Sequence, residues 1–185
     1  MKDLKLSTER LNLKLLKESD IPEMFAITQK YPEMSEFMTW NSPKTLAEAQ
    51  EKFLKTDCRD AEDLNFGVFL KENGKFIGRI TVRNFHLFQQ DAEKRSVFLS
   101  FWLTPEVQGK GLGTELLREI CRFCFEDLNL HKIFAGVFTQ NIPSQKLLAK
   151  IGFREIGLLR KHYLKNDEYY DSTRYELLAE DFSVE

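Results

Sequence analysis

The stretch Leu103-Thr-Pro-Glu-Val-Gln-Gly-Lys-Gly-Leu-Gly-Thr114 decides the fold, because it joins an aromatic, strand-like run to a long amphipathic segment. Its glycines alternate, at Gly109, Gly111 and Gly113. Glycine adopts unusual backbone dihedral angles and lets the main chain approach a ligand closely. A helix that follows such a turn supplies free N–H groups and the positive end of its dipole. These features predict a binding site for a pyrophosphate. The alternative is a tight strand-to-helix turn that binds no ligand.

The spacing of the glycines excludes two common nucleotide motifs. A P-loop requires G-x-x-x-x-G-K-[ST], which the chain lacks. The dinucleotide motif G-x-G-x-x-G would place its third glycine where Thr114 stands. Spacing alone therefore does not choose the ligand.

The hydrophobic pattern on either side of the turn predicts both strands and helices. Capping boxes at Asp20-x-x-Glu23 and Thr45-x-x-Glu48 each predict the start of a helix. The dipeptide Asn73-Gly74 between two apolar runs predicts a hairpin. Strands are expected over residues 10–15, 66–70, 76–82, 96–103, 133–138, 153–159 and 173–178, and two further helices over 112–128 and 141–151. The resulting order, β-α-α-β-β-β-α-β-α-β-β, implies an α+β or α/β fold in which helices cover a sheet.

Length and composition suit one domain over residues 1–185, since 42% of the residues are hydrophobic. The 27 Lys and Arg residues against 29 Asp and Glu give a net charge of −2, without the basic excess of a nucleic-acid binder. The apolar runs are far shorter than the ~20 residues that span a bilayer. The first residues also lack the apolar stretch of a signal peptide. We therefore expect a cytoplasmic protein with no nucleic-acid or membrane partner.

The cysteines point to neither a disulfide framework nor a metal site. The chain has three, Cys58, Cys121 and Cys124, and an odd, low count argues against disulfides. Cys121-x-x-Cys124 lies within a helical apolar pattern, and no second pair is present to complete a zinc site. We interpret these two residues as buried thiols.

Several segments together resemble the GNAT superfamily of acetyl-CoA-dependent N-acetyltransferases. Gln108-Gly-Lys-Gly-Leu-Gly113 resembles the family's Q/R-x-x-G-x-G/A turn, and Asn141-Ile-Pro-Ser-Gln-Lys-Leu-Leu-Ala-Lys-Ile-Gly-Phe153 resembles its N-x-x-(A/S)…G-F helix. The opening Ser7-Thr-Glu-Arg-Leu-Asn-Leu…Asp20 is similar to that of the RimJ/RimL branch, the ribosomal-protein N-terminal acetyltransferases. Phe101-Trp-Leu103 and Tyr169-Tyr-Asp171 are similar to that branch too. The resemblance covers nearly the whole chain.

The resemblance implies a GNAT fold and a set of cofactor contacts. The fold has a mixed, mostly antiparallel central sheet with one splayed parallel strand pair, here 96–103 and 133–138, and helices on both faces. Backbone groups of Trp102 and Leu103 would bind the pantetheine arm of acetyl-CoA, and Asn141 would also contact the cofactor. The pyrophosphate would be held by the N–H groups of the turn, whose residues are Gln108, Gly109, Lys110, Gly111, Leu112, Gly113 and Thr114. Lys110 would add positive charge, with a solvated side chain as the alternative.

The implied reaction is direct attack of a neutral amine on the thioester carbonyl. An ammonium with a pKa of ~10 must first lose a proton, an oxyanion needs a donor, and the leaving sulfur needs a proton or a hydrogen bond. Many relatives carry a Glu base where Phe98 stands and a Tyr acid where Leu148 stands. Ser144 remains to hydrogen-bond the sulfur, with helix capping as its alternative role.

Other polar residues are weaker candidates for the chemistry. Asp171 and Tyr163 are candidates for the base, with a structural hydrogen bond as the alternative for each. His86 and His131 are interpreted as surface or hinge residues, because nothing pairs them with a nucleophile.

The resemblance places the acceptor amine beside the early helices and the connection after the third and fourth strands. We expect Trp40 and Phe85 to border the acceptor, together with Phe37, Met38 and Phe88, and core packing is the alternative for each. The acceptor is a protein N-terminus or a small amine, and a homodimer is plausible by analogy with the branch. A non-catalytic acyl-CoA sensor or recruitment module is the alternative function.

Overall fold

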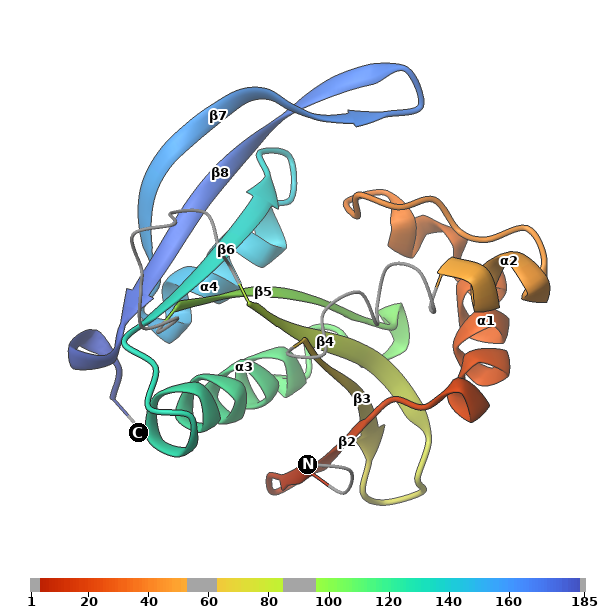
Figure 1. Ribbon diagram of the computed structural model, residues 1–185, viewed down its shortest axis with the longest axis horizontal. Coiled ribbons are helices and arrows are strands. Elements are labelled where there is room, and N and C mark those ends of the chain that lie inside the picture. Colours follow the sequence, from red (N-terminus) through yellow and green to blue (C-terminus); the bar gives the residue numbers. More distant parts are fainter. Residues whose placement is uncertain (1–3, 53–62, 85–95, 184–185) are drawn as a thin grey trace. The chain divides into compact units, whose positions relative to one another are not determined.

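The computed structural model describes residues 4–52, 63–84 and 96–183 (Figure 1). The chain divides into two compact units. The first unit comprises residues 1–82 and 101–112, and the second comprises residues 83–100 and 113–185. The chain therefore passes from one unit to the other three times. None of the described helices is long and apolar enough to cross a membrane.

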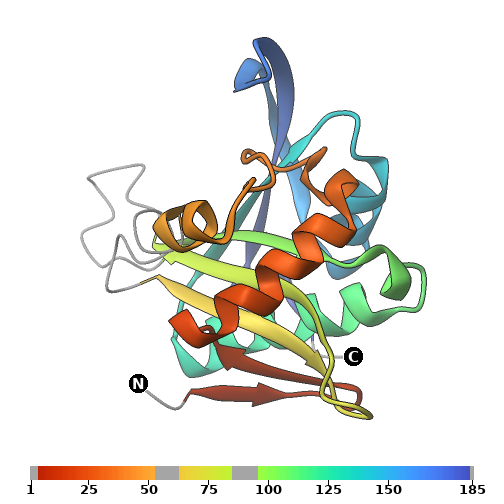
Figure 2. The same ribbon diagram turned by 90° about the vertical axis from the view of Figure 1, so that its right-hand side faces the viewer.

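The first unit holds an antiparallel set of strands in the order β1-β2-β3-β4. The strands are β1 (Lys5–Ser7), β2 (Leu11–Leu15), β3 (Leu64–Leu70) and β4 (Phe76–Asn84). Helices α1 (Ile21–Lys30) and α2 (Leu46–Lys52) and the 3-10 turns Glu18–Asp20, Pro32–Ser35 and Pro105–Val107 complete it. Figure 2 shows α1 crossing in front of β3 and β4. Every residue of β3 but its last is buried, whereas β2 buries Leu11 and Leu13 and exposes the residues after each.

The second unit orders its strands β5-β6-β8-β7. They are β5 (Ser96–Leu103, whose last three residues belong to the first unit), β6 (Lys132–Phe138), β8 (Glu168–Leu178) and β7 (Arg154–Lys165). The β5–β6 pair is parallel, and the other pairs are antiparallel. Helices α3 (Leu112–Arg122) and α4 (Ile142–Ile151) and the 3-10 turn Ala179–Asp181 accompany the strands. The mixed sheet with one parallel pair confirms the expected fold class.

The parallel ladder between β5 and β6 stops before either strand ends. Its paired residues run from Ser96 opposite Lys132 to Leu99 opposite Ala135. Residues 136–138 of β6 lie beyond the last pair, although they remain paired with β8. The splayed end that the resemblance implies therefore has its starting point at Leu99.

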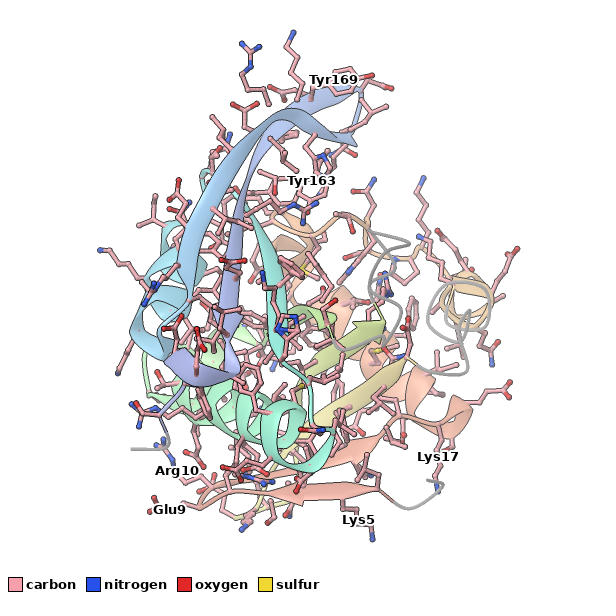
Figure 3. The ribbon with its side chains drawn as sticks, turned by 60° about the vertical axis from the view of Figure 1, so that its left-hand side comes forward. Lys5, Glu9, Arg10, Lys17, Tyr163 and Tyr169 are labelled. Carbon is pink, nitrogen blue, oxygen red and sulfur yellow. The ribbon has the colours of Figure 1, made fainter. Side chains whose placement is uncertain are left out.

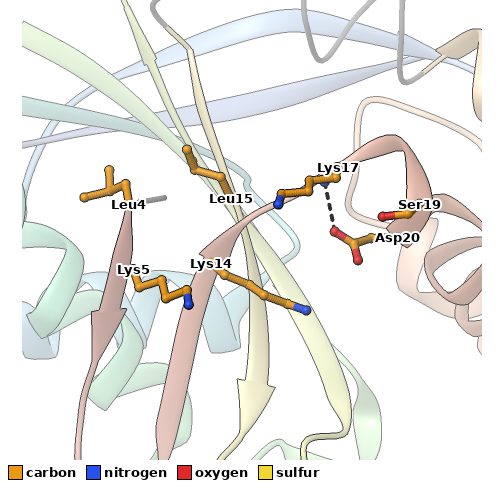
Figure 4. Close-up of a pocket in the computed structure, with 7 residues that line it drawn as sticks. All are labelled: Leu4, Lys5, Lys14, Leu15, Lys17, Ser19 and Asp20. Carbon is orange, nitrogen blue, oxygen red and sulfur yellow. Dashed lines mark hydrogen bonds between the residues drawn. The ribbon is translucent and has the colours of Figure 1, made fainter. Parts of the chain in front are cut away.

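Both predicted helix starts are confirmed, since α1 begins at Ile21 and α2 at Leu46, but the predicted capping hydrogen bonds need correction. Asp20 does not cap α1 with its side chain: its carboxylate accepts the N–H of Lys17 at 2.8 Å (Figure 4), because a 3-10 turn leads straight into the helix. Thr45 accepts the N–H of Glu48 at 3.1 Å as predicted, but the Glu48 carboxylate accepts the N–H of Lys44 instead of that of Thr45. The sequence also gave no sign of β1.

The final two strands are longer than the sequence pattern suggests. They form a hairpin whose two-residue turn, Asn166-Asp167, has φ values of 51° and 62°. Two positive φ angles mark a type I′ turn, which matches the right-handed twist of paired strands. Figure 3 shows Tyr169 near the tip of this hairpin. The predicted helix over 112–128 also ends differently, because α3 gives way to a π-helical turn at Phe123–Asp127.

Candidate functional site

The glycine turn has the backbone conformation that its composition predicts. Gly109 has a φ of 72° and Gly111 a φ of 80°, in the left-handed region that favours glycine. A Cβ at Gly109 would meet no atom within 4 Å, and one at Gly111 would meet only Arg10 Nη2, at 3.5 Å. The dihedral angles, and not crowding, therefore require glycine at these two positions. Gly113 differs, since it lies in the first turn of α3.

The N–H groups of the turn are available to a ligand. Within the described part of the chain, no residue accepts a hydrogen bond from the N–H of Gly109, Lys110 or Gly111, and all three residues are exposed. Helix α3 begins at Leu112, and the first N–H groups of any helix have no intrahelical partner. The turn and the helix start together offer a run of donors with the positive end of a helix dipole.

Gln108 has a different part in this turn. Its N–H donates to the carbonyl of Pro105 at 3.2 Å, and its side-chain Nε2 donates to the carbonyl of Leu103 at 3.1 Å. Gln108 therefore ties the turn back to the end of β5. The Leu103 carbonyl, expected to be open to pantetheine, already accepts this bond.

A distant arginine, which lies just before β2, supports the turn. Arg10 Nη1 donates to the carbonyl of Lys110 at 3.1 Å, across 100 positions of sequence. The backbone of Arg10 is itself fixed, because its carbonyl accepts the N–H of Lys71 at 2.9 Å. Arg10 belongs to the opening that resembles the RimJ/RimL branch, and that resemblance was the only signal in the sequence for its importance.

Glu106, just before the turn, is held by three donors that the sequence did not indicate. Lys30 Nζ lies 2.7 Å from its carboxylate, which also accepts bonds from Tyr31 and Lys75. The hydrogen bonds from Lys30, then Lys75 and then Tyr31 lower the pKa of Glu106 to about 2. These contacts join the segment before the turn to α1 and to the start of β4.

The end of β5 packs closely against β4. The Trp102 ring meets that of Phe76 edge to face, with centroids 5.8 Å apart, and the Thr104 N–H donates to the carbonyl of Ile77 at 2.8 Å. A Cβ at Gly78 would lie 2.4 Å from the Trp102 carbonyl oxygen. Glycine at position 78 therefore lets the backbone that is expected to bind pantetheine lie directly on β4.

Trp40, expected to border the acceptor, lies beside this strand end. A buried cluster of Phe69, Phe76 and Trp102 is covered by partly buried apolar side chains, namely Leu16, Met24, Ile27, Met34, Met38 and Trp40. Trp40 and Met38 thus pack against the cluster that includes Trp102. Phe85, Phe88 and His86 lie outside the described residues.

In the second unit, Asn141 and Ser144 lie together at the start of α4. The Asn141 side chain accepts the Ser144 N–H at 3.2 Å, which confirms the predicted N-cap, and Gly152 ends the helix with a φ of 108°. The hydroxyl of Ser144 has no hydrogen-bond partner among the described residues, and the side chain is half-buried. Ser144 is therefore capped through its N–H, while its hydroxyl stays available. Leu148 is fully buried and adds no polar group.

The remaining candidates for the chemistry have structural contacts. Asp171 Oδ1 accepts the N–H of Lys161 at 2.7 Å, where β7 bulges away from β8. The Tyr163 ring stacks on Phe138 with centroids 4.7 Å apart. The carbonyl of His131 accepts the N–H of Ala179. None of these contacts identifies a general base.

The cysteines and a surface pocket lie away from the glycine turn in sequence. Cys121 and Cys124 are buried free thiols, and burial raises both pKa values, that of Cys124 to about 12. Cys58 lies outside the described residues. No group of metal-ligating side chains occurs in the parts that the structure describes. The pocket in Figure 4 is lined by Leu4, Lys5, Lys14, Leu15, Lys17, Ser19 and Asp20, and it includes no residue of the glycine turn.

The chain is similar to known N-acetyltransferases. A family model described as "Acetyltransferase (GNAT) domain" matches residues 10–154. YjcK of Bacillus subtilis, named as an N-acetyltransferase, is 31% identical over 138 residues, covering 75% of this chain and 71% of its own. The L-amino acid N-acetyltransferase AaaT of Escherichia coli is 29% identical over 102 residues, covering 54% of this chain and 60% of its own.

Solved structures share the fold. The ribosomal-protein-S5-alanine acetyltransferase of Vibrio fischeri superposes with a TM-score of 0.81 at 22% identity, over 98% of this chain and all of the other. The spermidine N-acetyltransferase of Vibrio cholerae, solved with CoA and spermine, superposes with a TM-score of 0.77 at 24% identity, over 94% and 98% of the two chains. At these identities the likeness shows the fold alone.

Proposed function

Because the chain belongs to the acetyltransferase (GNAT) family, whose members are acetyl-CoA-dependent N-acetyltransferases, we propose that it acetylates a primary amine by direct attack in a ternary complex. We propose that residues 1–185 act as one acetyltransferase domain. The family match supports this, because it runs through residues of both compact units.

One observation carries the proposed cofactor site: the exposed N–H groups of Gly109, Lys110 and Gly111 have no acceptor among the described residues. They lead into the start of α3, where further N–H groups and the helix dipole favour an anion. The pyrophosphate of acetyl-CoA is the anion that the family uses. Leu112, Gly113 and Thr114 extend this donor set, and Trp102, Leu103 and Asn141 complete the proposed cofactor contacts.

The proposed reaction forms a C–N bond and breaks the C–S bond of the thioester. The acceptor ammonium first loses a proton to water or to a base that this chain does not share with its relatives, since Phe98 replaces the usual Glu. The amine then attacks the carbonyl carbon, the oxyanion collapses with release of the CoA thiolate, and the second proton of the amine nitrogen passes to that thiolate or to water. The free hydroxyl of Ser144 is proposed to donate a hydrogen bond to that sulfur.

The acceptor is proposed to be a protein N-terminus or a small-molecule amine. The names of the relatives and neighbours support both, since they include S5-alanine, spermidine and L-amino acid acetyltransferases. A homodimer and a cytoplasmic location belong to the same proposal, the first by analogy with the RimJ/RimL branch.

Two glycine variants with matched strain test the cofactor site. Gly109 and Gly74 have φ values of 72° and 71°, and a Cβ at either position would meet nothing within 4 Å. An alanine in this region costs ~1–2 kcal/mol, so Gly109→Ala and Gly74→Ala should lose similar stability. Only Gly109→Ala should weaken acetyl-CoA binding in calorimetry, because Gly74 lies in the β3–β4 hairpin turn.

The same preparations test the reaction through thiol release from acetyl-CoA with a panel of amines. An equal loss of acetyl-CoA affinity in both glycine variants would refute the proposed pyrophosphate site at the glycine turn. Tight binding of acetyl-CoA without turnover on any amine would favour the non-catalytic sensor. Turnover with Ser144→Ala equal to that of the wild type would remove Ser144 from the mechanism.

A further inference from the structure

Arg174 occupies an unusual position in the second unit. It lies on β8 directly opposite Gly136 of β6. Its Nη2 donates to Nε2 of His162 on β7 at 2.7 Å, and its guanidinium carbon lies 5.2 Å from the centroid of the Phe98 ring. One arginine therefore spans contacts to three neighbouring strands.

The guanidinium lacks an anionic partner within the described part of the chain. Nη1 is buried and has no hydrogen-bond acceptor there. A guanidinium carries five N–H donors, and the bond to His162 uses one of them. The acidic side chains nearby on β8 are engaged elsewhere, since Glu176 pairs with Lys132 at 2.9 Å and Asp171 accepts the Lys161 N–H. A buried N–H group without an acceptor is unfavourable, which suggests that a ligand supplies one.

Gly136 provides the space that this guanidinium occupies. A Cβ at position 136 would lie 2.2 Å from Nη1 of Arg174, and 3.1 Å from both its Cζ and the Tyr163 hydroxyl. Glycine inside a strand weakens it and often marks a close approach. Strand β6 therefore has no side chain at position 136, where the guanidinium of Arg174 lies.

The contact with Phe98 relates Arg174 to the reaction. Phe98 stands where many relatives carry the base that addresses the acceptor amine. Gly136 is the first residue of β6 beyond the end of the parallel ladder, where the splay begins. Arg174 therefore lies beside the position of the usual base and opposite the first residue beyond the parallel ladder.

We propose that Arg174 binds a carboxylate of the acceptor, so that the acceptor class is an amine that also carries a carboxylate, as amino acids do. This inference rests on the proposed function. A planar guanidinium with unused N–H groups binds a carboxylate through two parallel, charge-assisted hydrogen bonds. A polyamine, whose charges are all positive, would be repelled at the same position. Arg174 is thus a specificity-determining residue and not a catalytic one.

Matched pairs of amines that differ only by a carboxylate test the proposal on the wild-type protein. Suitable pairs are β-alanine with ethylamine, phenylalanine with phenethylamine, and methionine with 3-(methylthio)propylamine. We expect the carboxylated member to have a kcat/KM at least about tenfold higher in one or more pairs, as expected for a charge-assisted bond. Equal or higher kcat/KM for the decarboxylated member of every pair would overturn the proposal.

Variants then assign the preference to Arg174. Arg174→Gln should lower kcat/KM for the carboxylated member by about 10- to 100-fold and so remove the preference. Arg160 is exposed on β7, so Arg160→Gln serves as the control and should keep the preference for the carboxylated amine. Loss of kcat/KM by the same factor for both members of a pair would show a structural role and overturn the proposal. If Arg174→Gln fails to fold, the wild type is tested with propionate as an inhibitor. We expect propionate to compete with the amine. Absence of competitive inhibition would count against the proposal.

The two proposals fail in distinguishable ways. Acetyl-CoA binding without acetylation of any amine would refute the proposed function, and this inference with it. Equal acetylation of amines with and without a carboxylate would refute the role of Arg174 and leave the proposed function standing.

Discussion

Replacement of Gly78 by alanine should displace the strand end that is proposed to bind pantetheine. The new Cβ would lie 2.4 Å from the Trp102 carbonyl oxygen, 2.5 Å from Leu103 Cδ2 and 3.1 Å from Leu103 Cα. Two of these three atoms belong to the backbone, so a side-chain rotation cannot relieve the contact. The end of β5 must therefore move relative to β4.

The size of the effect follows from these distances. Ordinary van der Waals contact begins at 3.4 Å, so the Trp102 carbonyl must retreat by about 1 Å. The Thr104 N–H to Ile77 carbonyl bond, at 2.8 Å, and the packing of Trp102 on Phe76 resist this movement. Overpacking of this kind costs ~1–3 kcal/mol. For a chain of this length, ~2 kcal/mol lowers the Tm by roughly 4–8 °C.

Urea denaturation and acetyl-CoA calorimetry on Gly78→Ala measure the two consequences. Gly157→Ala is the control, because a Cβ there meets nothing within 4 Å and its φ lies outside the left-handed region. We expect the control to match the wild type in both measurements. A Gly78→Ala protein with wild-type stability and wild-type cofactor affinity would refute the argument. Lower stability with unchanged affinity would refute only the role of Trp102 and Leu103 in binding.

Two further predictions concern the α4 cap and Glu106. Asn141→Ala removes the acceptor of the Ser144 N–H and should lower the free energy of unfolding, measured with urea, by ~1 kcal/mol. Lys146 is exposed on the same helix, so Lys146→Ala should leave that free energy unchanged. Equal losses of stability in the two variants would contradict the capping role of Asn141. Because the folded state lowers the pKa of Glu106 from 4.5 to about 2, its ionised form contributes stability above pH 4.5 that is lost as the pH falls toward 2. The stability difference between wild type and Glu106→Gln should therefore shrink from pH 7 to pH 3, and a difference that stays constant would contradict this.

The sequence predicted those features of the fold that depend on local chemistry. The glycine turn, the Asn141 cap, the Gly152 stop and the hairpin at Gly74 each follow from the conformational preferences of one or two residues. The hairpin of β7 and β8 was underestimated for a physical reason. Its outer part is exposed on both faces, with Leu158 and Tyr169 more than half exposed, so the apolar–polar alternation that marks a half-buried strand is absent.

The support of the site could not be predicted, because it depends on long-range pairing. Nothing in the pattern selects Arg10, out of 27 Lys and Arg residues, as the partner of the Lys110 carbonyl. Likewise, the closeness of Arg174 to Gly136 depends on the register of β6 on β8. Composition and spacing identify the residues that offer chemistry, whereas the register of the sheet decides which neighbours they meet.

The bond from Arg10 to the Lys110 carbonyl has a consequence for the order of events during folding. The entropic cost of closing a loop of this length exceeds the net contribution of one hydrogen bond, so we expect the turn to be fixed only after strand β2 has joined its neighbours. On the ribosome, the amino-terminal strand must wait until a segment 100 positions later has emerged. The proposed binding of acetyl-CoA by the turn therefore becomes possible late, once the strands of the first unit have paired.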